Sequence, residues 1–329
     1  MTNKQIYLFV FLYTILFPCS FLSAQTTPGE KKPFTIIVDA GHGLPDVGAR
    51  GMQTNEATIT LAVSLKLAKA LREQFPQFRV LQTRTTPSLP GGYTNAVAAN
   101  RYRAEFANQS GGDLFIALHC NASGRRPGGW YEKRVVGSTP QTRYIKKGKK
   151  KVKQTYYVKQ YEDVWVENKA SGTETYIWAV GKNDQKVSSI QNNDDYHEEG
   201  SEGDDELTMP NPNDPAEKAR MLIYAQHYFR KSYNLATLVE KEFIASGRNS
   251  RGVQQRNHKG IWVLQATGMP SILIEMGFVS NKDEEAYMMS EEGQAQIVNA
   301  IIKAIRAYTG NTPVNIAPPP TASNTTPAL

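Results

Sequence analysis

Four side chains of this 329-residue chain combine types and positions that suit metal-dependent hydrolysis. They are His42, Glu56, His119 and Glu275. Two neutral imidazoles and one carboxylate can hold a catalytic zinc ion with one position open for water, and the fourth group can then act as the base. The four residues are scattered along the chain, so their spacing is less diagnostic than that of an HExxH helix. On the residues alone, structural roles stay open, because a histidine after a strand can serve packing and Glu275 can cap a loop.

The elements that must position these groups are short buried strands. Ile36–Val38, Leu114–Leu118 and Ser271–Ile274 are apolar runs with the length and composition of such strands, and three of the four groups follow them. In an α/β sheet, ligands gather at the carboxyl ends of strands, and glycines such as those flanking His42 let the backbone approach a ligand closely. Glu56 instead opens a helical pattern capped by Thr54-Asn55, where an acidic side chain can also simply favour the helix dipole.

The rest of the chain continues the alternation of strands and helices and predicts an α/β fold class. Further strands are expected at Phe78–Gln82, at Thr173–Val180 with alternating faces, and at Trp262–Leu264. Further helices are expected at Asn100–Gln109, from Asp214-Pro215 to Phe243 with a break allowed, and at Gln294–Tyr308.

The N-terminus has the pattern of a secretory signal peptide. Lys4 precedes the apolar run Ile6–Phe17, and small residues lead to an expected cleavage near Ala24. The run is shorter than the ~20 residues a bilayer span needs, which favours a signal over an anchor, and bulky residues before Cys19 disfavour a lipoprotein signal. We therefore expect a periplasmic or otherwise exported protein with no stable membrane span after cleavage and no nucleic-acid partner.

Composition bounds the partners further. The formal net charge of +7 and the pI of about 9.2 favour anionic surfaces such as cell-wall polymer, nucleic acid or membrane, without choosing among them. Removing the signal leaves Cys120 as one thiol with no intramolecular bridge, so stability must come from the core or a metal. The expected organisation is a signal peptide at 1–24, a linker at 25–32, one catalytic domain at 33–309, and a disordered tail at 310–329 rich in Pro, Thr and Ala.

A charged insertion is expected at about 131–215. Arg143–Lys153 is heavily basic, whereas the block 194–206 holds eight acidic residues and no Lys or Arg. The acidic block is interpreted as a solvated loop, with a regulatory segment as the alternative.

Five motifs in order carry a resemblance to a known family. The segments VDAGHGLPDVGARG, NEATITLAVSLKLAKAL, LFIALHCNAS, GTETYIWAV and VLQATGMPSILIEMGFVSN resemble those of the zinc-dependent N-acetylmuramoyl-L-alanine amidases that separate daughter cells, the type 3 amidase domain. The resemblance implies a twisted, mainly parallel sheet of about six strands flanked by helices. It also implies hydrolysis of the amide bond between N-acetylmuramic acid and L-alanine of the peptidoglycan stem peptide, by a monomer.

The same resemblance implies roles for individual residues. His42, Glu56 and His119 would bind Zn2+, and Glu275 would be the catalytic glutamate. Asp39 and Asp46 are candidates to orient the histidines, with loop hydrogen bonding as the alternative, and Asn121 and Arg84 are further candidates to contact ligands or substrate. Family members can be autoinhibited by a segment over the zinc, which suggests an activator protein as a partner. Acidic side chains of the insertion could act in that way, among them Glu198, Glu199 and Glu202.

Two other functions remain open on sequence grounds. One is an inactive peptidoglycan-binding protein in which Arg143–Lys153 holds anionic glycan. The other is a zinc peptidase acting on another peptide bond of the wall.

Overall fold

The computed structural model describes residues 32–178, 215–255 and 261–310. The predicted signal peptide, nearly all of the linker, the acidic block 194–206 and almost the whole predicted tail lie outside these ranges. Among the helices of the described residues, none is both long and apolar enough to span a bilayer.

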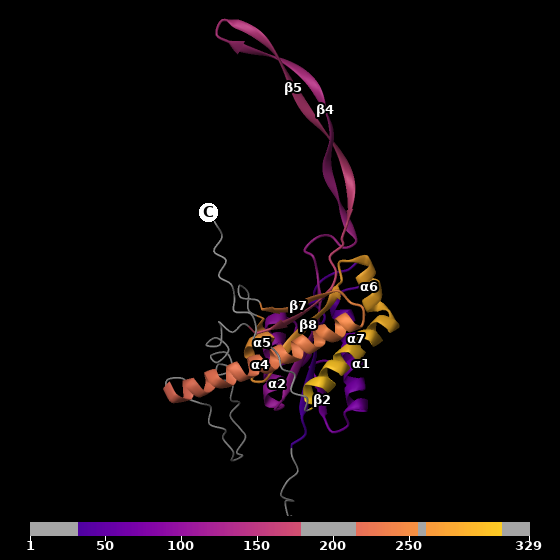
Figure 1. Ribbon diagram of the computed structural model, residues 1–329, viewed down its shortest axis with the longest axis vertical. Helices are drawn as coiled ribbons and strands as arrows, with labels where there is room; N and C mark the ends of the chain where they lie inside the picture. Colours follow the sequence, from indigo (N-terminus) through magenta and orange to yellow (C-terminus); the bar gives the residue numbers. More distant parts are fainter. Residues whose placement is uncertain (1–31, 179–214, 256–260, 311–329) are drawn as a thin grey trace, which may run out of the picture. The chain divides into compact units, whose positions relative to one another are not determined.

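Within the described ranges, a six-stranded mixed sheet forms the centre of the domain (Figure 1). Its strand order is β2-β1-β3-β8-β6-β7, and β6 runs antiparallel to β8 while the other neighbouring pairs are parallel. This confirms the predicted α/β class with a mainly parallel sheet of about six strands. The strands are β1 Thr35–Ala40, β2 Arg79–Gln82, β3 Leu114–Asn121, β6 Thr173–Ile177, β7 Ser250–Gln255 and β8 Ser271–Phe278.

Helices cover both faces of the sheet. Successive residues of its central strands point to opposite faces, and they are apolar on both, so both faces must be buried. Ile116 and Leu118 pack on one face with α1, α4, α6 and α7, whereas Phe115 and Ala117 pack on the other with α2 and α5. The helices are α1 Glu56–Gln74, α2 Ala96–Gln109, α4 Pro215–Ala245, α5 Trp262–Ala266, α6 Lys282–Met289 and α7 Glu291–Thr309, with the short 3-10 helix η1 at Pro90–Gly92.

Two predicted elements differ from the structure. Trp262–Leu264 was expected as a strand but begins the short helix α5, in which Leu264 and Gln265 both donate their N–H groups to the carbonyl of Ile261. Periodicity cannot separate so short an apolar run from a buried helical turn. The expected alternation of faces in Thr173–Val180 is also wrong, because all five residues of β6 are buried between β8 and β7.

The carboxylate of Glu240 holds the long helix α4 against the sheet. It accepts hydrogen bonds from Thr173 at 2.8 Å, Thr175 at 2.6 Å and Ser250 at 2.6 Å. Burial raises the pKa of Glu240, and the three hydroxyl donors oppose that rise. Strands β6 and β7 are thereby tied to α4, which runs to Ala245 without the break that the sequence allowed.

Strands β4 Gly129–Lys147 and β5 Lys150–Glu167 form a separate antiparallel hairpin, seen as a twisted ribbon in Figure 1. Nearly all of its side chains are exposed. The predicted insertion at 131–215 is therefore not uniform, since it contains most of this hairpin and also β6, a strand of the central sheet.

A fully buried ion pair fixes the end of β1. The guanidinium of Arg103 on α2 contacts the carboxylate of Asp39, and both side chains are 1% exposed. Arg103 also donates to the carbonyl oxygens of Ala40 at 2.7 Å and His42 at 2.5 Å. One arginine thus links helix α2 to the segment that follows β1.

Replacing this arginine should destabilise the whole domain. We expect Arg103→Ala to lower the free energy of unfolding by about 3–5 kcal/mol, because it leaves the Asp39 carboxylate buried without its partner. Urea unfolding measures the free energy of unfolding of Arg103→Ala and of the control Arg101→Ala, which replaces an exposed arginine on the same helix. Equal losses in Arg103→Ala and Arg101→Ala would contradict the expectation.

Candidate metal centre

The candidate site is built on the loop between β1 and α1. His42 has a φ of 59°, in the left-handed region that a side chain other than glycine rarely occupies. Arg84 is buried and donates to the carbonyl oxygens of Ala40 at 2.9 Å, Gly41 at 2.9 Å and Ala57 at 2.8 Å. This residue, a predicted substrate or ligand contact, therefore holds the backbone of β1 and α1 together.

The far end of the same loop is held by a second buried side chain. Glu285 on α6 accepts the backbone N–H groups of Met52 at 3.0 Å, Gln53 at 2.7 Å and Thr54 at 2.9 Å. Asn55 then caps α1 by accepting the N–H of Thr58 at 3.1 Å, as the sequence predicts. The first helical residue, Glu56, is in this way aimed back at the loop.

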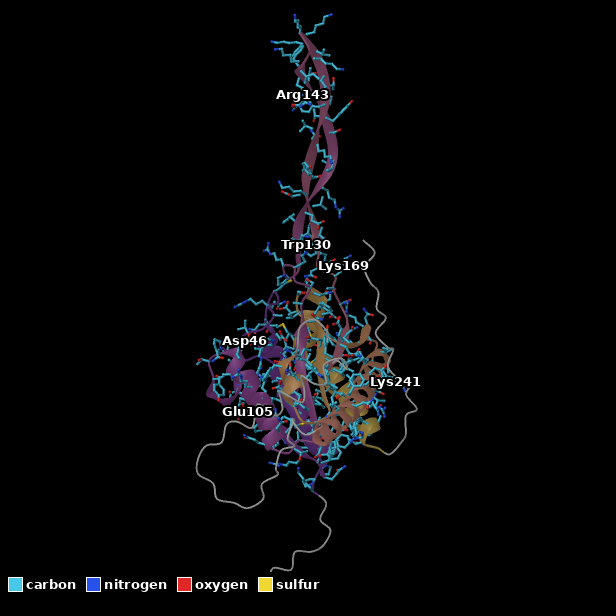
Figure 2. All side chains as sticks on the ribbon, turned by 90° about the vertical axis from the view of Figure 1, so that its left-hand side faces the viewer. Asp46, Glu105, Trp130, Arg143, Lys169 and Lys241 are labelled. Carbon is cyan, nitrogen blue, oxygen red and sulfur yellow. The ribbon has the colours of Figure 1, made fainter. Side chains whose placement is uncertain are left out.

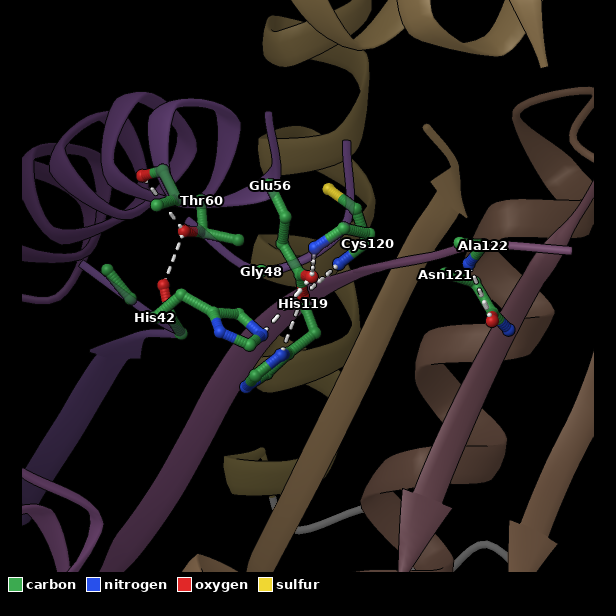
Figure 3. A network of polar contacts seen from close by, with 12 residues as sticks. His42, Gly48, Glu56, Thr60, His119, Cys120, Asn121 and Ala122 are labelled. Carbon is green, nitrogen blue, oxygen red and sulfur yellow. Dashed lines mark hydrogen bonds and ion pairs between the residues drawn. The ribbon is translucent and has the colours of Figure 1, made fainter. Parts of the chain in front are cut away.

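Three of the four predicted residues meet at one point (Figure 3). His42 Nε2 lies 3.2 Å from Glu56 Oε2, and His119 Nδ1 lies 2.8 Å from Glu56 Oε1. One ligand atom from each residue lies within 4.8 Å of the others. Two imidazoles and one carboxylate at this separation form a donor set that suits Zn2+.

Asp46 contacts the first histidine. Its Oδ2 lies 2.9 Å from His42 Nδ1, and its Oδ1 accepts the N–H of Gly48 at 3.2 Å. A carboxylate on Nδ1 directs the other ring nitrogen, Nε2, toward the cluster. Asp46 thus contacts His42 as expected of an orienting residue.

The carboxylates of Glu56 and Asp46 favour the protonated form of His42. Burial lowers the pKa of His42, but hydrogen bonds and charges from Glu56 and Asp46 outweigh this and raise the pKa to about 9. Burial acts to raise the pKa of Glu56, yet the hydrogen bonds from His119 and His42 hold it far below its ordinary value. The charged carboxylate of Glu56 can also bind a divalent cation, which then competes with the proton on His42.

Two glycines leave the space that the cluster fills. A Cβ at Gly41 would lie 2.4 Å from the ring of His119, and one at Gly48 would lie 2.5 Å from Glu56 Oε2. Gly48 also has a φ of 65°, which glycine adopts without strain. The backbone and the donor set therefore both fit a bound metal ion.

Glu275 stands beside this cluster on the neighbouring strand. It pairs with His119 in the parallel register of β3 and β8, and its side chain lies on the same face of the sheet. Burial raises the pKa of the adjacent Cys120 thiol far above its ordinary value, and the charges of Glu56 and Glu275 raise it further. The thiol is therefore neutral, which leaves the carboxylates and imidazoles as the reactive groups.

Sequence reasoning missed Glu174, which lies directly opposite Glu275 on β6. Its carboxylate contacts the guanidinium of Arg251 and accepts hydrogen bonds from Tyr176 at 2.6 Å and Asn121 at 3.2 Å. Asn121, a predicted site residue, thus joins β3 to β6 beside Glu275. Glu174 belongs to the segment GTETYIWAV, but its position opposite Glu275 is revealed only by the register of the antiparallel neighbour.

Asp39 forms its hydrogen bonds with residues other than the two histidines. Its carboxylate contacts Thr83 and Arg103, so the structure favours the alternative that it serves local hydrogen bonding. The roles of all predicted site residues in catalysis stay predictions.

The fold and the cluster together define a class, namely α/β domains with a candidate metal-binding group of two histidines and one glutamate at the carboxyl edge of the sheet. The sequence profile of the family N-acetylmuramoyl-L-alanine amidase (Amidase_3) matches residues 36–307. The chain belongs to this family.

Curated relatives agree with this assignment. The chain is 25% identical over 288 residues to an uncharacterized cell wall amidase of Bacillus anthracis, and 25% identical over 279 residues to the probable N-acetylmuramoyl-L-alanine amidase AmiB of Haemophilus influenzae. The matches cover 86% and 84% of this chain but 38% and 52% of those proteins.

A solved structure supports the fold. The CwlD amidase of Clostridioides difficile, in complex with the GerS lipoprotein, aligns with a TM-score of 0.50 and 21% identity. The alignment covers 84% of this chain and 98% of that one.

Filling the space at Gly48 should abolish the donor set. We expect Gly48→Ala to weaken Zn2+ binding by about 100-fold or more, because its Cβ would displace Glu56 and His42. Gly124→Ala is the matched control, since Gly124 has a φ of 72° but open space around it. Competition with a chromophoric chelator measures both, and equal affinities would show that the cluster is not the binding site.

Removing Asp46 should weaken the site without destroying it. We expect Asp46→Ala to lower Zn2+ affinity by about 10–100-fold, because the His42 ring loses the acceptor that orients it. Asp46→Asn, which keeps an acceptor oxygen, should retain more of the affinity. The same chelator competition ranks the variants, and an unchanged Asp46→Ala would exclude the orienting role.

Proposed function

We propose that this protein is a peptidoglycan amidase that hydrolyses the bond between N-acetylmuramic acid and L-alanine of the stem peptide with the help of Zn2+. We further propose that it acts outside the cytoplasm in cell-wall remodelling and daughter-cell separation. Family membership supports the reaction class. The single observation that carries the proposal is the cluster of His42, Glu56 and His119 beside Glu275.

The metal would be held by His42, His119 and Glu56. When bound, Zn2+ supplies positive charge that polarises the scissile carbonyl and acidifies water. Asp46 keeps the His42 ring in its binding orientation, and Gly41 leaves room for the ring of His119. Neutral imidazoles are needed for this role, so metal binding must displace the proton that Glu56 and Asp46 stabilise on His42.

Glu275 is left for proton transfer. The Glu56 carboxylate already accepts the backbone N–H groups of Ala49 at 2.9 Å and Cys120 at 3.0 Å in addition to its imidazole contacts. A carboxylate with four such partners stays charged and fixed. Glu275, on the neighbouring strand, can accept a proton from the attacking water and pass it to the leaving amine.

Glu174 and its neighbours would position Glu275 and the substrate. The Arg251 side chain is about half exposed, packs over the ring of Phe278 at 5.1 Å and contacts Glu174. Its exposed part offers a cation to a substrate carboxylate beside the catalytic face.

Replacing Glu275 should lower the rate of catalysis and leave metal binding unchanged. We expect Glu275→Gln to lower the rate of stem-peptide release from purified peptidoglycan by about 10²–10⁴-fold, while bound Zn2+ stays near one per chain. Release of peptides with N-terminal L-alanine, identified by mass spectrometry, is the readout. The surface variant Glu291→Gln is the control, since the Glu291 side chain is 90% exposed.

Three results would overturn the proposal. Unchanged activity in Glu275→Gln would remove the assigned base. Products cut within the stem peptide would indicate a zinc peptidase of another wall bond, and wall binding by a metal-free protein without any product would indicate an inactive binding protein.

A further inference from the structure

The hairpin of β4 and β5 presents one face lined with exposed aromatic rings. The register pairs Tyr131 with Trp165, and the rings of these two lie 5.1 Å apart. Along β5, Tyr157 and Tyr161 precede Trp165 at intervals of four residues, which places all three on one side of the strand. Tyr157 and Tyr161 are 69% and 57% exposed.

A bulge in β4 keeps this face continuous. Val136 is the extra residue between Val135, paired with Tyr161, and Gly137, paired with Gln160. An extra residue shifts the alternation of the following strand by one position. Two residues thirteen positions apart lie on opposite faces of a regular strand, but the bulge places Tyr144 on the same face as Tyr131. Tyr144 is 71% exposed. We call the face carrying Tyr131, Tyr144, Tyr157, Tyr161 and Trp165 the aromatic face.

The hairpin also concentrates the positive charge of the chain. Residues 129–167 contain ten Lys and Arg against four Asp and Glu, which is a net of +6 out of +7 for the whole sequence. The end of the hairpin, 143–153, holds seven of these cations and no acidic residue. Figure 2 shows Arg143 near that end and Trp130 near the base, with side chains projecting from the ribbon into solvent.

The base of the hairpin is fastened beside the candidate metal centre. The N–H of Gly128 donates to the carbonyl of Ser280, just after β8, at 3.0 Å. The buried Asn168 donates through Nδ2 to Ser123, just after β3, at 2.8 Å. His119 and Glu275 lie in the carboxyl-terminal halves of β3 and β8, so the ribbon leaves the domain from the edge where the proposed chemistry occurs.

We propose that the aromatic face and the basic end of the hairpin bind a peptidoglycan strand and lead it to the candidate metal centre. Tyrosine and tryptophan rings offer flat apolar surfaces to the faces of sugar rings, and lysines offer cations to the carboxylates of stem peptides. An extended polymer matches a row of rings that follows the length of the ribbon. This inference rests on the proposed function, since it takes the substrate polymer as the ligand.

Two other occupants fit the hairpin less well. A bilayer surface would require large apolar side chains at the hairpin end, but residues 146–151 are five lysines and one glycine. A second copy of the chain would bring two highly cationic ribbons together, which like-charge repulsion opposes.

The test uses the full chain carrying Glu275→Gln, so that the polymer is not consumed, and purified peptidoglycan freed of attached polymers. Co-sedimentation gives the dissociation constant. We expect the double substitution Tyr157→Ala with Tyr161→Ala to raise it by about tenfold through loss of two ring contacts. The matched control is Tyr156→Ala, because Tyr156 lies on the other face, where its hydroxyl donates to Gln141 at 2.7 Å. This control should bind like the parent.

A second variant tests the charges independently. Replacing Lys149, Lys150 and Lys151 by glutamine should weaken binding at low salt and reduce its dependence on salt concentration, since exposed charges are screened. All of these positions are exposed, so circular dichroism and thermal unfolding should be unchanged.

The possible failures are distinguishable. Hydrolysis of a small soluble muramoyl peptide, measured with Glu275 intact, should be the same with and without the hairpin substitutions; absence of hydrolysis in the unsubstituted protein would defeat the proposed function alone. Equal weakening by Tyr156→Ala, or none by the double substitution, would overturn the hairpin proposal. Tighter binding to vesicles of phosphatidylglycerol than to peptidoglycan would also overturn it. The same holds for a dimer, detected by sedimentation velocity, that dissociates in the double-substituted variant.

Discussion

The site depends on the contacts that hold the buried carboxylate of Glu56. It is 4% exposed and receives two imidazoles and two backbone N–H groups, so its charge is stabilised by partners from the loop after β1 and from β3. A buried charge must have such partners to avoid a large desolvation penalty. The position of α1, the left-handed conformation of His42 and the absence of side chains at Gly41 and Gly48 all serve this requirement.

The two carboxylates of the proposed reaction differ in their surroundings. Glu56 sits at the first turn of a helix, inside a closed set of donors, whereas Glu275 lies on a strand next to the Glu174, Asn121 and Arg251 group. The surroundings of Glu56 hold its charge in place, whereas β8 positions the carboxylate of Glu275 at the carboxyl edge of the sheet. Different environments for chemically identical side chains allow one to hold a cation and the other to move protons.

The sequence predicted the sheet and the meeting of the central residues because both depend on local signals. Buried strands are short apolar runs, and in a parallel sheet their ends meet at one edge, which brings His42 and His119 together. Glu174 and Arg103 escaped prediction because their importance comes from pairing with distant strands and from burial, which no local pattern encodes. The hairpin was missed for another reason, since its strands bury little and its residues resemble those of a solvated loop.

The charge on the hairpin has a consequence for diffusion. With +6 of the formal charge on residues 129–167, the remaining residues of the sequence are close to neutral, so the chain is strongly asymmetric in charge. A fixed negative surface then exerts a torque on the protein as well as an attraction, and it turns the ribbon toward itself before contact. Productive orientation would therefore be selected during approach, and its rate would fall as dissolved ions shorten the range of the field.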